Sequence, residues 1–81
     1  MPEYHRFHGS VQIEALRVAR HAGEIMDEVI KHLVGLNGAD VQVTLEIQAK
    51  FPDSVPDHVI RAVTENCRTL HFDSSTSFEE D

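Results

Sequence analysis

VQVTLEIQAKF, residues 41–51, followed by PDSVPDHVIRAVTENCRTLHF, residues 52–72, is the stretch that decides the fold prediction. Its first part alternates apolar and polar side chains, which is the period of a strand with one buried face. In its second part, apolar residues recur every three or four positions, which predicts an amphipathic helix over about 55–67. The alternation returns at 69–73, so this stretch predicts a strand, a helix and a second strand.

The residues before this stretch repeat the same order. Alternation in FHGSVQI predicts a strand over about 6–13. From Glu14 to Leu33 the apolar residues take helical spacing, which predicts an amphipathic helix of about five turns. Gly23 lies inside this helix, where glycine costs about 1 kcal/mol relative to alanine. Two interpretations of it stand: a close approach of the helix to the sheet or to a partner, and a tolerated glycine.

The predicted order is therefore strand, helix, strand, helix, strand. Each helix has a single apolar stripe and the long strand has a single apolar face, which is typical of two packed layers. We therefore expect an α+β or α/β domain, a two-layer sandwich with both helices on one face of a three-stranded mixed or parallel sheet. Residues 1–73 are predicted to form one compact domain, and 74–81, SSTSFEED, a flexible acidic tail.

Composition narrows the function classes. Seven Lys and Arg stand against fourteen Asp and Glu, a net charge of −7 that argues against a nucleic-acid partner. The sequence has neither an apolar run long enough to span a bilayer nor a signal-like start, so we expect no membrane partner. Cys67 is the only cysteine and falls on an apolar helix stripe, as expected of a small buried side chain. These features predict a cytoplasmic protein.

No spacing of residues predicts catalysis. Ser10, Ser54, Thr64 and Cys67 have structural explanations, and no phosphate-binding loop occurs. Neither an enzyme nor a cofactor is therefore expected. An alternative is a small stand-alone metal- or ligand-binding protein, since His8, Glu46 and His71 would meet on the outer sheet face if the strand order allowed it.

The open polar side of the predicted sheet is the candidate interface. It comprises Gln42, Thr44, Glu46, Gln48 and His71. A helical cover on one face leaves these residues accessible, either as a hydrated surface or as an interface with another domain or a second copy. Both interpretations remain open at this point.

Residues 7–73 resemble the C-terminal region of a family of large, poorly characterised prokaryotic ATP-binding proteins related to AAA+ ATPases. The resemblance rests on VARHAGEI, VTLEI, PDSVPD and TENCRTLHF, and on the later pair Phe78 and Glu79. It implies a noncatalytic accessory module that serves docking or assembly of the ATPase. The expected partner is then a protein, either the ATPase body in cis or a second copy. The ATPase motifs of that family lie outside the resembling region, so no residue role carries over.

Overall fold

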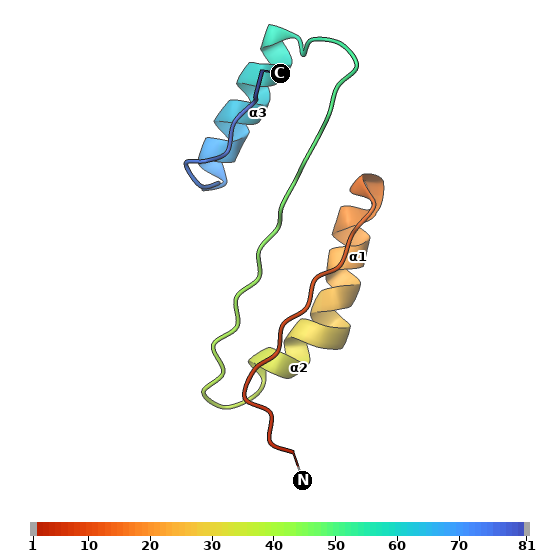
Figure 1. The fold of residues 1–81 in the computed structure, drawn as a ribbon, viewed down its shortest axis with the longest axis vertical. Helices are drawn as coiled ribbons and strands as arrows, with labels where there is room; N and C mark the ends of the chain where they lie inside the picture. The colour runs from red at the N-terminus through yellow and green to blue at the C-terminus, as the bar shows by residue number, and fades with distance from the viewer. Residues whose placement is uncertain (1, 81) are drawn as a thin grey trace. The chain divides into compact units, whose positions relative to one another are not determined.

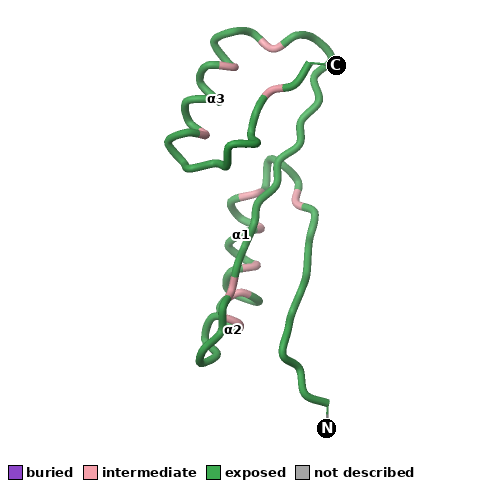
Figure 2. The backbone as a smooth tube through the Cα atoms, turned by 60° about the vertical axis from the view of Figure 1, so that its left-hand side comes forward, coloured by how far each residue is buried: buried purple, intermediate pink, exposed green. Residues whose placement is uncertain are grey.

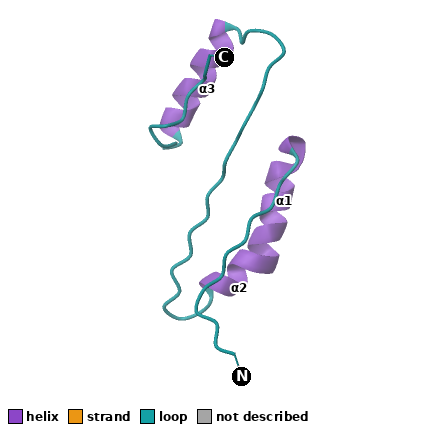
Figure 3. Ribbon diagram, in the orientation of Figure 1, coloured by secondary structure: helices purple, strands orange, loops and turns teal. Residues whose placement is uncertain are grey.

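The computed structural model describes residues 2–80, and their regular structure is helical. Backbone contacts divide the chain into two units, Met1–Leu45 and Glu46–Asp81, and each is described here by itself. The first unit carries one long helical run and the second carries one helix, and the remainder is loop and turn (Figures 1 and 3). Among the described residues, no helix combines the length and apolar character needed to cross a lipid bilayer.

The long helical run of the first unit is made of four consecutive pieces. A 3-10 turn η1 (Ala15–Arg17) leads into helix α1 (Val18–Ile25), a π-helical turn η2 (Met26–Ile30) and helix α2 (Lys31–Val34). The run therefore matches the helix predicted from Glu14 to Leu33. It ends where Leu36 donates to the carbonyl of Leu33 and Gly38 adopts φ 79°. A glycine meets that left-handed conformation without steric cost.

The π-helical turn decides which side chains share one side of the run. The half-buried residues there are Val18, His21, Ile25, Ile30 and Leu33. The step from Ile25 to Ile30 is five residues, and it spans a turn in which Lys31 donates to the carbonyl of Met26. A regular helix would have turned past this face after four residues. Leu16, predicted to lie on the apolar stripe, is instead 101% exposed.

In the second unit, helix α3 (Asp57–Thr69) corresponds to the helix predicted over 55–67. Pro56 precedes it with extended ψ, and no side chain caps its first turn. The chain after the helix returns along it (Figures 1 and 2). Phe78 is half-buried and its ring centroid lies 6.4 Å from that of Phe51. The predicted tail thus includes one aromatic residue that contacts the segment before α3.

The predicted α+β or α/β sandwich is wrong, because no described residue belongs to a strand. Residues 6–13 and 41–51 are neither helical nor hydrogen-bonded into a ladder within the described chain. Alternation predicts a ribbon with one apolar side, but it does not specify which segment pairs with it. Pairing depends on contacts remote in sequence, and the described residues of each unit form few of them. With no sheet, the two-layer arrangement of helices over strands is also absent from the described residues.

The third predicted strand, 69–73, is replaced by the end of α3. His71 adopts φ 63°, the left-handed conformation that terminates many helices. Phe72 donates to the carbonyl of Cys67 at 2.9 Å, and His71 donates to that of Arg68 at 3.1 Å. These two bonds form a Schellman motif, which satisfies carbonyls that the helix would leave unpaired. Local capping therefore determines this segment in place of the alternation of Leu70 and Phe72.

No described residue is buried in either unit (Figure 2). The half-buried side chains lie on the helices and beside them, whereas the alternating segment 41–51 is exposed on both its sides, apart from half-buried Val41. Val43, Leu45 and Ile47 expose 68%, 60% and 66% of their surface. A hydrophobic core, which normally offsets the entropy lost on folding, is thus not formed by the described residues of either unit taken by itself.

Candidate functional site

The predicted interface residues lie in two different environments. Gln42, Thr44, Glu46 and Gln48 follow one another in the non-helical segment between α2 and α3, and each is exposed. His71 is also exposed, but it occupies the capping turn after α3. The sheet that was to gather them on one face is absent from residues 2–80. The segment 41–51 is therefore the candidate functional surface, and the interface role of His71 stays a prediction.

The metal alternative finds no support in the described residues. Across 2–80, no three His, Cys, Asp or Glu side chains are grouped so that they could hold a metal ion. His8 belongs to the first unit, whereas Glu46 and His71 belong to the second, and the alternative that joins them stays a prediction.

Two ion pairs lie on the charged side of the first helical run. Arg17 Nε lies 3.4 Å from Glu14 Oε2, and Arg20 Nε lies 3.5 Å from Glu24 Oε1. These side chains are largely solvated, so each pair contributes about 0.5 kcal/mol or less. The pairs line a shallow hollow together with Gln12 and His21. With each of these arginines beside a carboxylate, this surface is not a concentrated positive patch.

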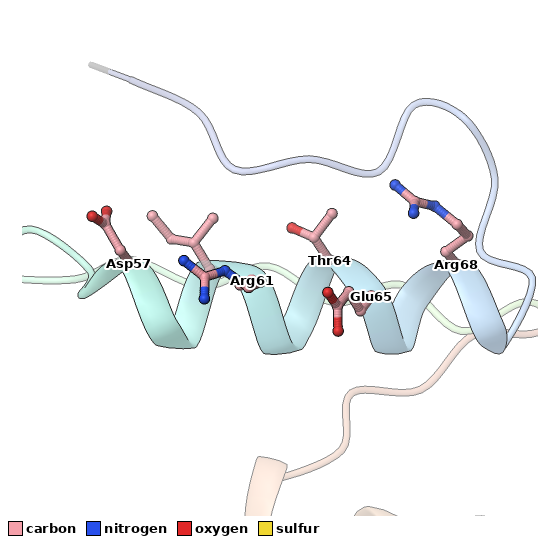
Figure 4. Close-up of a pocket in the computed structure, with 6 residues that line it drawn as sticks. Asp57, Arg61, Thr64, Glu65 and Arg68 are labelled. Atoms are coloured by element: carbon pink, nitrogen blue, oxygen red, sulfur yellow. The ribbon is translucent and has the colours of Figure 1, made fainter.

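A second shallow hollow follows α3 (Figure 4). Figure 4 shows its side chains along the helix, with the returning C-terminal segment passing beside them. It is lined by Asp57, Ile60, Arg61, Thr64, Glu65 and Arg68. Acidic and basic groups alternate along this surface, which is typical of a solvent-exposed helix face. The hollow presents neither a grouped set of metal ligands nor a nucleophile beside a base.

The turn after α3 is stabilised by one carboxylate. Asp73 Oδ1 accepts hydrogen bonds from the hydroxyl and the backbone amide of Ser75 and from the hydroxyl of Thr76. The bond from the Ser75 hydroxyl, followed by that from the Ser75 amide, holds the pKa of Asp73 below its ordinary value. The reason is that these donors favour the ionised carboxylate. The shift thus reflects a local turn in an exposed loop, and it does not indicate a catalytic acid.

Gly23 has open space around it. A Cβ built at Gly23 meets no atom within 4 Å, and the residue lies inside α1. Within the described chain, the close approach suggested for this glycine is therefore not made. The remaining question is whether a partner approaches it.

Replacing Gly23 by alanine is expected to stabilise the helical run by about 1 kcal/mol, because alanine loses less backbone entropy in a helix. The measurement is helical content by circular dichroism during thermal unfolding. Gly38→Ala is the matched control, and it is expected to destabilise the chain, since the φ of 79° at Gly38 is unfavourable for alanine by about 1 kcal/mol. Weaker association of Gly23→Ala at unchanged helicity would instead reveal a partner packed against Gly23.

Comparison of the chain with protein-family models, with curated proteins and with solved structures finds no match. The resemblance to the C-terminal region of prokaryotic ATP-binding proteins therefore stays a prediction. What the described residues define is a helical chain with a long exposed, non-helical segment between α2 and α3.

Proposed function

We propose that this chain is a noncatalytic interaction or assembly module that completes its hydrophobic core by binding a protein. The observation that carries the proposal is the exposure of apolar side chains on every part of the described chain. Monomeric soluble proteins rarely expose extended apolar surface, and where they do, it commonly marks an interaction site. The charge of −7 keeps such a chain soluble before it binds.

The resemblance suggests the setting of this module. A C-terminal accessory domain of a larger prokaryotic ATPase-like protein would work in the cytoplasm, and the ATPase body or a second copy would be its partner. This assignment rests on VARHAGEI, VTLEI and TENCRTLHF. The interaction role itself rests on exposed apolar surface and is independent of it.

The test is the state of the 81-residue chain as a dilute monomer. We expect an expanded particle whose helix amides exchange rapidly, because isolated helices of this length are marginal in water. Small-angle scattering coupled to chromatography and amide hydrogen exchange measure these properties. A monomer with a radius of gyration of about 12 Å and slowly exchanging amides would overturn the proposal, since it would already possess a core.

A further inference from the structure

Residues 40–50, DVQVTLEIQAK, form an exposed segment whose backbone is free to pair. They are neither helical nor turned, and residues 41–50 form no backbone hydrogen bond with any other described residue. Val43, Leu45 and Ile47 alternate with exposed polar residues. An extended segment of this kind presents unpaired amides and carbonyls, which makes it a template for a strand from another chain.

The sequence of this segment is complementary to its own reverse. Placed antiparallel to a second copy with Leu45 opposite Leu45, every apolar residue faces an apolar residue and every polar residue faces a polar one. Asp40 then lies opposite Lys50 at both ends of the ladder, so two pairs of opposite charge are formed. The complete pairing is Asp40 with Lys50, Val41 with Ala49, Gln42 with Gln48, Val43 with Ile47, Thr44 with Glu46, and Leu45 with itself. Directly opposed side chains on one face are the pairs that stabilise antiparallel strands.

Other registers are less favourable. A parallel pair in register places Asp40, Glu46 and Lys50 each against its own copy, which opposes like charges three times. An antiparallel pair centred on Glu46 opposes the two Glu46 carboxylates. A shift by one residue sets apolar side chains against polar ones. Centring on Ile47 keeps the apolar pairs but leaves Lys50 opposite Thr44, without an acidic partner.

The ladder needs further cover, because two strands alone are marginally stable in water. The half-buried apolar sides of α1 and α3 supply the surface to cover the apolar side of the ladder.

We propose that the partner is a second copy of this chain, paired antiparallel through residues 40–50 about a two-fold axis at Leu45. This inference rests on the proposed function and names its partner and binding segment. The ladder joins two chains, and the described residues of one chain contain no strand. A two-fold arrangement follows because the same segment contributes both strands, so that each contact occurs twice.

The test is a charge reversal at both ends of the ladder in the 81-residue chain. Asp40→Lys opposes two lysines at each end and Lys50→Asp opposes two aspartates, so each variant is expected to raise the dimer dissociation constant about tenfold. Asp40→Lys is expected to weaken the dimer even though it makes the net charge less negative than −7. That change in net charge would by itself favour association, because it lowers the repulsion between the two copies. The double variant D40K/K50D restores opposite pairs and is expected to return the constant to near the starting value. Sedimentation equilibrium measures all three.

Asp53→Lys is the matched control, because it makes the same charge change at an exposed position outside the paired segment. It is expected to leave the dissociation constant unchanged or slightly lower. A chain that stays monomeric at every concentration overturns this inference, as does a dimer unaffected by both single variants or not restored by the double variant. An expanded monomer would still support the interaction role with a different protein, whereas a compact and protected monomer would overturn both proposals.

Discussion

Leu45→Asp is expected to abolish the dimer at micromolar concentrations, raising its dissociation constant more than about a hundredfold. In the proposed ladder the two Leu45 side chains face each other at the axis, so a single substitution acts twice. Each aspartate removes about 2 kcal/mol of apolar burial and places a carboxylate opposite its own copy. The measurement is molar mass by light scattering across a dilution series.

Gln42→Asp provides the control for Leu45→Asp. It adds the same charge on the polar side of the segment, where the proposed register places it opposite neutral Gln48. We expect its dissociation constant to stay within about threefold of the unmodified chain, as for most exposed substitutions. Equal loss of association in both variants would show that net charge alone governs the interaction, and the ladder would have to be abandoned.

Ile25→Ala is expected to reduce both helical content and association, with a loss of about 2 kcal/mol per chain. The direction of the change in helical content is informative, because alanine has a higher intrinsic helix propensity than isoleucine, by about 0.4 kcal/mol. An isolated helix would therefore gain helicity from this substitution. A loss is expected only where the half-buried side of α1, to which Ile25 belongs, is covered in the assembly. Circular dichroism at several protein concentrations measures the effect.

Leu16→Ala is the corresponding control in the same helical run. Leu16 is fully exposed in the 3-10 turn, so its truncation removes no covered surface. Little change in helicity or association is expected. If Leu16→Ala and Ile25→Ala behave alike, the half-buried side of the run is not the covered side, and the assignment of the apolar stripe is wrong.

The helices were predictable from sequence because their determinants are local. Apolar spacing placed one helical run from Glu14 to Leu33, and the structure has it from Ala15 to Val34. The face of that run was less predictable. The π-helical turn inserts one residue into the apolar repeat after Ile25, and none of the residues from Met26 to Ile30 predicts such a turn.

The strands could not be predicted in the same way, because a strand requires a second segment to pair with, and its own sequence does not specify that segment. Alternation in 41–51 predicts a ribbon with one covered side, but the described chain offers it no ladder and leaves both of its sides exposed. At His71, a helix-capping turn forms in place of the strand that the alternation of Leu70, His71 and Phe72 predicted. The candidate segment rests on Gln42, Thr44, Glu46 and Gln48, and its role as an interface stays a prediction. The proposed pairing adds the opposed charges of Asp40 and Lys50, which are found when the segment is compared with its own reverse.

The exposed backbone of residues 41–50 also bears on how long a single chain survives in a cell. Proteases bind their substrates as extended backbone, and a segment free of helix and hydrogen bonds meets that requirement without unfolding. The proposed pairing with a second copy would occupy the same amides and carbonyls. Turnover would then act on unpaired chains and spare paired ones, and the concentration at which the chain assembles would set its cellular abundance.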